Sequence, residues 1–212
     1  MYSRVLLVAI AAFLIGLTVT VLFYNLRIDS ASAQIQDLER DFSEGRSALL
    51  FFQTFKGQEN FCASFSPLLQ SLADQANAMG DRVYSLEKVQ NYNDPNLLKI
   101  KQDYTLRNIE LWLYIINLKT QCSSSNIHTI LYFYTNEPGK CMECGAQLIA
   151  LEDVRNSDKN IWVFAVERNI QLSLIDAIAL RYNVQTLPSL VIDEKNTLSS
   201  FQSKTQIEAA LR

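Results

Sequence analysis

The hydrophobic pattern of this chain changes its period at the polar stretch Ser123–Asn126. Beyond it, short β-branched and aromatic runs alternate with segments of helical spacing, as in an α/β domain. We predict strands at residues 129–134, 161–166, 189–192 and 197–201, and helices at residues 141–155, 172–182 and 204–211. This order implies a mixed sheet with a parallel βαβ unit, and we place the domain at residues 126–212.

The strongest chemical signal is the sequence Cys141-Met142-Glu143-Cys144, between the first predicted strand and helix. Free N–H groups and the helix dipole stabilise negative charge at a helix amino terminus, so we expect Cys141 to be the attacking thiolate. Cys144, one turn later, would resolve the mixed disulfide. A zinc site and an inert disulfide are the alternatives, but there is no second C-x-x-C and His128 is the only histidine. We expect no metal and no cofactor.

A proline stands at the start of the third predicted strand, where its missing N–H costs no ladder hydrogen bond. With this proline, the C-x-x-C and the order of elements, residues 127–212 resemble the thioredoxin superfamily. The resemblance implies a thioredoxin-like α/β fold, in which a cis-proline loop faces the C-x-x-C and offers backbone groups to a substrate chain. The implied roles are Cys141 as nucleophile, Cys144 as resolving thiol, Pro188 as cis-proline and Leu187 as its neighbour in substrate binding.

Several positions depart from the usual pattern of that family. Met-Glu stands between the cysteines, Lys140 replaces the usual Trp before them, and residues 129–134 contain no acidic residue. Residues 136–139 lengthen the approach to the site. The direction of electron transfer stays open, because it depends on the reduction potential.

The region before the linker, residues 29–125, has helical spacing and predicts an antiparallel hairpin. Ser66-Pro67 is a typical helix start, with Ser66 as N-cap, and Asp94-Pro95 repeats that signal after a turn at Asn91–Pro95. The second helix is expected to end near Cys122.

Cys62 and Cys122 lie at equal sequence distances from the predicted turn. In an antiparallel hairpin folded there, the two cysteines reach the same height, so we predict a structural disulfide at its open end. The alternative is a pair of buried free cysteines, since cysteine packs as a small hydrophobe. A disulfide of this kind persists only in an oxidising compartment.

Residues 1–28 contain an uncharged apolar run, Val5–Tyr24, that is long enough to cross a bilayer as a helix. We predict an uncleaved transmembrane anchor, because the apolar part of a signal peptide is shorter. A cleaved signal, with Ala31-Ser32-Ala33 as the cleavage site, and a buried soluble helix are the alternatives. The expected location is the cell membrane, single-pass, with the carboxyl-terminal domain on the extracytoplasmic side.

Together these features predict a membrane-anchored thiol–disulfide oxidoreductase that acts on protein dithiols or disulfides. Its expected partners are the lipid bilayer, through residues 5–24, and a membrane redox protein. The net charge of −3, with scattered basic residues, argues against nucleic acid as a partner. The alternative is a non-catalytic thioredoxin-like scaffold or subunit of a membrane assembly.

Overall fold

The computed structural model describes residue 16 and residues 47–89, 94–122 and 126–212. The chain divides into two compact units, Met1–Phe55 and Lys56–Arg212, and residues 47–55 of the first are helical. The predicted anchor at residues 5–24 lies, except for Gly16, outside the described residues. Among the residues that are described, no helix combines the length and apolar character needed to cross a membrane.

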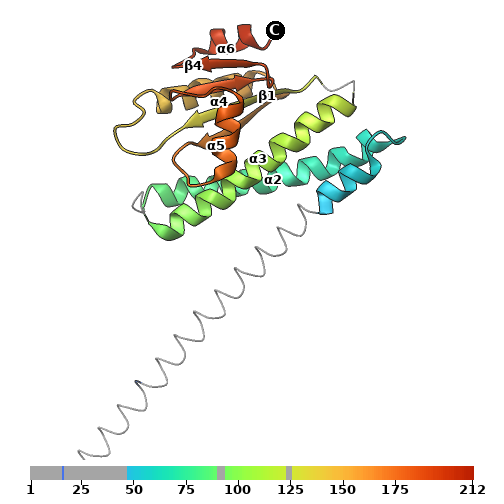
Figure 1. The fold of residues 1–212 in the computed structure, drawn as a ribbon, viewed down its shortest axis with the longest axis horizontal. Coiled ribbons are helices and arrows are strands. Elements are labelled where there is room, and N and C mark those ends of the chain that lie inside the picture. Colours follow the sequence, from blue (N-terminus) through green and yellow to red (C-terminus); the bar gives the residue numbers. More distant parts are fainter. Residues whose placement is uncertain (1–15, 17–46, 90–93, 123–125) are drawn as a thin grey trace, which may run out of the picture. The chain divides into compact units, whose positions relative to one another are not determined.

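The second unit begins with an α-helical hairpin, which confirms that prediction. Helix α2 (Phe61–Glu87) packs along helix α3 (Pro95–Gln121), and Figure 1 shows the two helices in cyan to green. Asp94 caps α3: its Oδ1 accepts hydrogen bonds from the backbone N–H groups of Asn96 (2.8 Å) and Leu97 (3.1 Å).

The predicted start of α2 at Ser66 is wrong, because the helix begins at Phe61 and contains Pro67. Proline removes one intrahelical hydrogen bond. Aromatic packing outweighs that loss: within α2 the buried Phe61 and Phe65 rings stack with centroids 5.4 Å apart, and Phe65 meets Tyr114 of α3 edge-on at 5.8 Å. Aromatic packing, rather than the local cap signal at Ser66, therefore determines where α2 begins.

Gly80 lets α2 approach Tyr104 of α3, since a Cβ at this position would lie 3.1 Å from the Tyr104 ring. Burial raises the pKa of Tyr104, as expected for a ring held between helices. We expect Gly80→Val to lower the free energy of unfolding by about 1–3 kcal/mol through overpacking, measured by urea denaturation. The matched control is Gly145→Val in a helix position with nothing within 4 Å, which should stay within about 0.5 kcal/mol of wild type. Equal effects at both positions would contradict the close-approach explanation.

The α/β region after the hairpin contains the predicted mixed sheet. Its strands are β1 (His128–Tyr134), β2 (Ile161–Glu167), β3 (Ser189–Ile192) and β4 (Asn196–Ser199). The spatial order is β2-β1-β3-β4, with β1 and β2 parallel and the other two pairs antiparallel. The helices are α4 (Cys144–Ser157), α5 (Ser173–Arg181) and α6 (Lys204–Ala210). Helix α6 opens with the capping box expected from Ser203 and Gln206.

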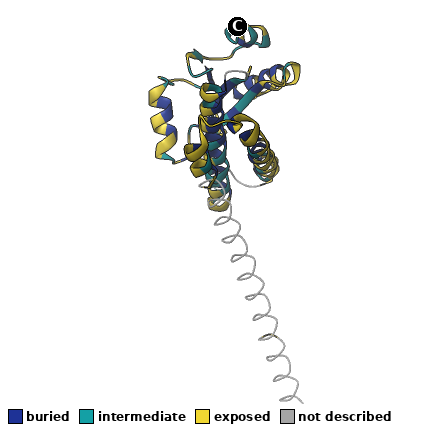
Figure 2. Ribbon diagram, turned by 90° about the vertical axis from the view of Figure 1, so that its right-hand side faces the viewer, coloured by how far each residue is buried: buried dark blue, intermediate teal, exposed yellow. Residues whose placement is uncertain are grey.

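Helices α4 and α6 cover one face of the sheet, and they share an apolar core with it. Leu151 and Val154 of α4 and Ile207 of α6 lie in one buried cluster with Ile130 and Leu190 of the strands. Figure 2 shows these strands as a dark blue layer between helices that are yellow on their outer surfaces. Burial of this kind contributes about 1.5–3 kcal/mol for each large aliphatic side chain.

Helix α3 packs on β2, and polar contacts fix it there. Asn108 of α3 donates a hydrogen bond to the backbone carbonyl of Ala165 in β2 (3.5 Å). Lys101 of α3 is only 1% exposed, and its Nζ lies 2.5 Å from Glu167 of β2 and 2.7 Å from Glu87 of α2. This buried charge cluster (Lys101, Glu167 and Glu87) joins both helices of the hairpin to the sheet.

A second polar contact joins the end of α3 to the β3–β4 turn. Lys119 Nζ lies 2.7 Å from Asp193 Oδ1, and His128 Nδ1 lies 2.7 Å from Asp193 Oδ2. Burial works to raise the pKa of Asp193, but the hydrogen bonds from Lys119, His128 and the Thr129 N–H outweigh it and lower that pKa. The carboxylate is thus held in its charged form beside the first residues of β1.

The hairpin is closed at its open end by a disulfide between Cys62 and Cys122, with 6.0 Å between the Cα atoms. We expect the double variant Cys62→Ser/Cys122→Ser to lower the free energy of unfolding by about 2–4 kcal/mol, because this bond closes a long loop. Urea denaturation should show the loss. The control is Cys141→Ser/Cys144→Ser, which opens a loop of sequence separation 3 rather than 60 and should cost less. A larger loss in the control would contradict the assignment.

Candidate functional site

Cys141 and Cys144 form a disulfide at the start of α4, with 5.5 Å between their Cα atoms. The helix begins at Cys144 rather than at Cys141 as expected, and Glu143 is its N-cap. Cys144 is buried (5% exposed), whereas Cys141 is partly exposed and Met142 between them is 96% exposed. One sulfur of the pair is therefore more accessible to a second molecule than the other.

The electrostatic setting of the pair comes from the helix start and two exposed charges. The first N–H groups of α4 have no acceptor within the helix, so they favour a thiolate nearby. The Glu143 side chain makes no capping hydrogen bond, while its carbonyl accepts one from Gln147 N–H (2.9 Å). Lys140 and Glu143 are both exposed, and water screens their opposing effects on the sulfur atoms.

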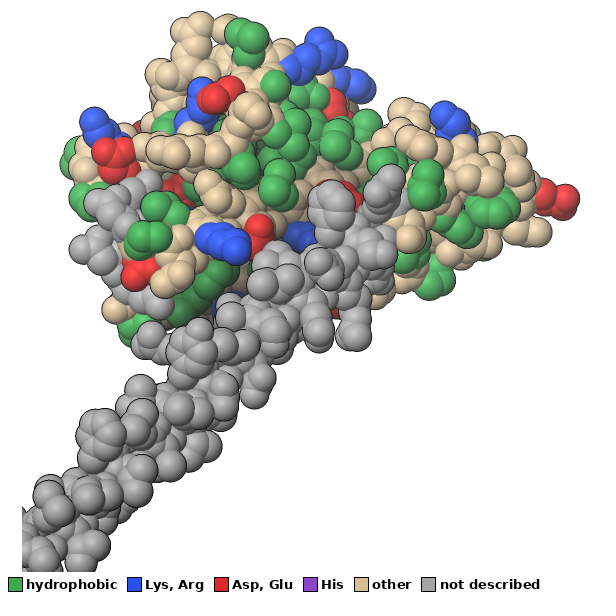
Figure 3. Space-filling view, turned by 60° about the horizontal axis from the view of Figure 1, so that its bottom comes forward, with side chains coloured by type: hydrophobic (Ala, Val, Ile, Leu, Met, Phe, Trp, Pro, Cys, Tyr) green, Lys and Arg blue, Asp and Glu red, His purple; other side chains and the backbone are tan. Residues whose placement is uncertain are grey.

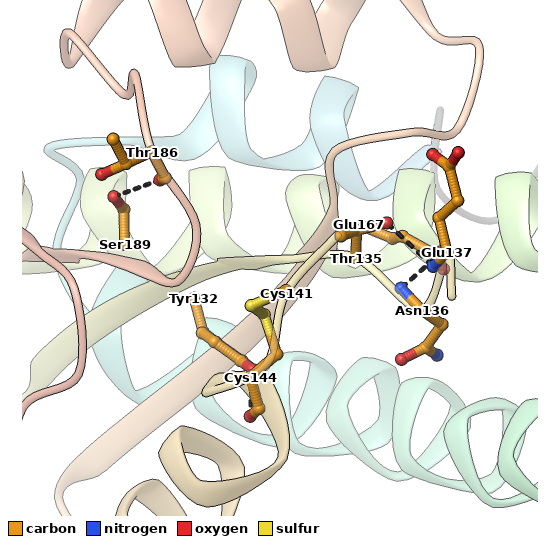
Figure 4. Close-up of a disulfide and its surroundings, with 9 residues drawn as sticks. All are labelled: Tyr132, Thr135, Asn136, Glu137, Cys141, Cys144, Glu167, Thr186 and Ser189. Carbon is orange, nitrogen blue, oxygen red and sulfur yellow. Dashed lines mark hydrogen bonds between the residues drawn. A yellow bond between two sulfur atoms is a disulfide. The ribbon is translucent and has the colours of Figure 1, made fainter. Parts of the chain in front are cut away.

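Tyr132 of β1 anchors the start of α4 from below. Its buried hydroxyl donates a 2.6 Å hydrogen bond to the backbone carbonyl of Cys144, and Figure 4 shows Tyr132 beside the disulfide. Burial raises the pKa of Tyr132, so the hydroxyl keeps its proton. Sequence reasoning missed this contact, since Tyr132 fits the strand pattern as an ordinary core residue.

The Leu187–Pro188 segment lies at the same end of the sheet as the cysteine pair. Its peptide bond is cis, and it directly precedes β3. Ser189 pairs with Phe133 across the antiparallel β1–β3 ladder, so Pro188 falls beside the end of β1 that leads to Cys141. The register thus brings residues that are distant in sequence to the same end of the sheet.

The hydrogen bonds of this segment leave the backbone N–H and C=O of one residue without a partner in the described part of the chain. Pro188 accepts a backbone hydrogen bond from Ser200 (2.9 Å), and Ser189 Oγ donates to the carbonyl of Thr186 (2.7 Å). Within the described part of the chain, no hydrogen bond reaches the backbone N–H or C=O of Leu187. Leu187 therefore presents a free donor and a free acceptor next to Pro188.

The buried acid nearest in register to the end of β1 is Glu167, which pairs with Tyr134 across the parallel ladder. Its carboxylate accepts the backbone N–H of Asn136 (3.3 Å) besides meeting Lys101. Asn136 also donates its side-chain amide to Glu87 (2.8 Å). The buried charge cluster therefore fixes the segment that leads into Cys141, a role that no pattern in the sequence indicates.

The two cysteine pairs lie apart. Cys122 follows Lys119 by one helical turn, and Lys119 Nζ lies 3.5 Å from Thr129 Oγ1 near the beginning of β1. Cys141 follows the other end of that strand. The structure therefore brings Cys141, Cys144, Leu187 and Pro188 to one end of the strands. Cys62 and Cys122 lie toward the opposite end.

The surface shown in Figure 3 has scattered charges of both signs, with hydrophobic side chains gathered between them. Two exposed apolar residues of the described chain lie on α4, Leu148 (42%) and Ile149 (62%), one to two turns after the cysteine pair. The same helix that begins at Cys144 thus carries exposed apolar side chains.

No family model matches this chain, and no curated protein matches it. Among solved structures, one described as "Structure of a malarial protein" is similar over 39% of this chain and 91% of its own, with 22% sequence identity and a TM-score of 0.31. This distant similarity assigns no family.

Proposed function

We propose that the chain is a membrane-tethered thiol–disulfide oxidoreductase whose redox pair is Cys141–Cys144. The observation that carries the proposal is the disulfide itself: it spans the start of α4, with Cys141 partly exposed and Cys144 buried beneath it. An accessible sulfur beside free helix N–H groups is suited to attack, and a buried neighbour is suited to resolve the product.

In the oxidised form, a client thiolate attacks Sγ of Cys141, and the Cys141–Cys144 bond breaks with Cys144 leaving as a thiolate. A second client thiolate then attacks the client sulfur of the mixed disulfide, forming a client disulfide and releasing Cys141 as a thiolate. The client loses two electrons and the pair gains them. The reverse sequence reduces a client disulfide, and the reduction potential selects between the two directions.

Leu187 is the proposed contact for the client backbone. Its N–H and C=O, which make no hydrogen bond in the described part of the chain, lie next to Pro188, at the end of the sheet where β1 leads to Cys141. An extended client segment would satisfy both groups in the manner of an added strand. The resemblance of residues 127–212 to the thioredoxin superfamily supports this role for the segment.

The tether and the compartment belong to the same proposal. The uncharged run Val5–Tyr24 supports a single membrane span, and two disulfides support an oxidising, extracytoplasmic location for residues 56–212. Membrane fractionation followed by protease treatment of intact cells would test both: protection of the carboxyl-terminal domain from external protease would contradict the orientation.

The redox function has a direct test in cells with the variant Cys144→Ser. Without the resolving thiol, the Cys141 mixed disulfide with a client persists, so the variant should accumulate as thiol-sensitive adducts on non-reducing gels. The matched control, Cys141→Ser/Cys144→Ser, should show no adducts. If Cys144→Ser traps nothing and the wild type neither oxidises nor reduces a test peptide, the chain is a thioredoxin-like scaffold instead.

A further inference from the structure

Gln147 is a polar residue buried where an apolar one would ordinarily stand. It lies one turn after Cys144 in α4, is 0% exposed, and belongs neither to the cysteine pair nor to the Leu187–Pro188 segment. A buried amide is tolerated only where its donor and acceptor are both used, because an unsatisfied polar group is costly.

Both ends of this amide bind the backbone of one residue in the β4–α6 connection. Gln147 Oε1 accepts the N–H of Gln202 (2.7 Å), and Gln147 Nε2 donates to the C=O of Gln202 (3.1 Å). The two bonds hold the connection against α4. They use both the N–H and the C=O of one residue, as a neighbouring strand does in a sheet. We refer to this contact as the Gln147–Gln202 amide pair.

From Gln202, hydrogen bonds continue to the Leu187–Pro188 segment. The Gln202 side chain donates to the carbonyls of Ser199 (3.0 Å) and Ser200 (3.3 Å). Ser200, held at a φ of 67°, donates its own N–H to the carbonyl of Pro188 (2.9 Å). A left-handed backbone is unfavourable for serine and persists only where its surroundings impose it.

We infer that Gln147 is a positioning residue that sets the Leu187–Pro188 segment relative to the cysteine pair. The inference deepens the proposed function and rests on it. Gln147 extends from the helix that begins with Cys144, and the hydrogen-bonded path through Gln202 and Ser200 ends on the carbonyl of Pro188. The path fixes the carbonyl beside Leu187 while leaving the N–H and C=O of Leu187 itself open to a client strand.

The test compares two substrates of the purified full-length chain: a cyclic peptide disulfide, which needs the Leu187 backbone, and dithiothreitol, which does not. In Gln147→Met, which keeps side-chain length but makes no such hydrogen bonds, we expect the exchange rate with the peptide to fall about tenfold, mainly through weaker peptide binding. The rate with dithiothreitol should stay within about twofold of wild type. The control is Gln70→Met on the exposed face of α2, which should leave both rates unchanged.

If Gln147 only stabilises the fold, Gln147→Met lowers both rates together. If Gln147 has no role, neither rate changes. Either result overturns the inference. Gln202→Ala provides a milder second variant, since it removes only the bonds to Ser199 and Ser200, and it should show the same selective loss to a smaller extent. Hydrogen exchange should also become faster at the Ser200 amide in both variants, and unchanged exchange there would overturn the inference independently. A wild-type chain inert toward both substrates would instead refute the proposed function itself.

Discussion

Replacing Lys101 with methionine is expected to lower the free energy of unfolding by about 3–5 kcal/mol. Lys101 is the cation of the buried charge cluster, with Glu167 only 1% exposed beside it. Without Lys101, the Glu167 carboxylate remains in the interior with the Asn136 N–H but no counter-ion, and a buried unpaired charge is among the costliest defects in a fold. Urea denaturation of the variant and the wild type measures the difference.

A second substitution separates this charge effect from lost packing. In Lys101→Met/Glu167→Gln the fully buried charge of Glu167 is gone, and the carboxylate of Glu87 that remains is partly exposed to water. The amide that replaces the Glu167 carboxylate keeps an oxygen for the Asn136 N–H, so at least half of the lost stability should return. The matched control, Lys99→Met on the exposed side of the same helix, should change stability by less than about 0.5 kcal/mol. A double variant no more stable than Lys101→Met would assign the loss to packing instead.

Replacing Cys141 with serine is expected to reduce thiol–disulfide exchange with a peptide substrate by at least about 10³-fold. Cys141 is the partly exposed sulfur of the pair, and a serine hydroxyl neither ionises near neutral pH nor forms a disulfide. Stopped-flow or alkylation-quenched assays of peptide oxidation state measure the rate.

The double variant Cys62→Ser/Cys122→Ser is the control for this prediction. It also removes two cysteines and one disulfide, yet it should keep the exchange rate within about twofold of wild type at a temperature well below its melting point. If that variant were inactive and Cys141→Ser active, the roles assigned to the two pairs would be reversed.

Local signals in the sequence predict much of the secondary structure. The cap-then-proline signal at Asp94 and the capping box at Ser203 both begin helices where expected, because each depends on side chains within one turn. The same signal at Ser66 fails, because α2 already begins at Phe61, where Phe65 packs against Tyr114 of a helix far along the chain. Equal spacing of Cys62 and Cys122 about the turn also places them at one height, which is a consequence of helix geometry alone.

The polar interior of the site could not be predicted in this way. Gln147 bonds to a residue 55 positions away, and the cluster of Lys101, Glu87 and Glu167 draws its members from three separate elements. A single polar residue in a helix looks the same in sequence whether it faces water or a partner. Only the packing of α3 on β2 and of the β4–α6 connection on α4 decides which of these side chains are buried.

The two disulfides lie toward opposite ends of β1, and this separation prevents electron exchange between them within one molecule. The strand has seven residues, and at about 3.3 Å per residue it extends roughly 23 Å, whereas exchange requires sulfur atoms in contact. Under the proposed function, electrons accepted at Cys141–Cys144 therefore cannot pass to Cys62–Cys122 of the same chain. The proposed oxidoreductase would thus exchange a single electron pair in each molecule, and after each reaction with a client a separate thiol or disulfide would have to restore the Cys141–Cys144 pair.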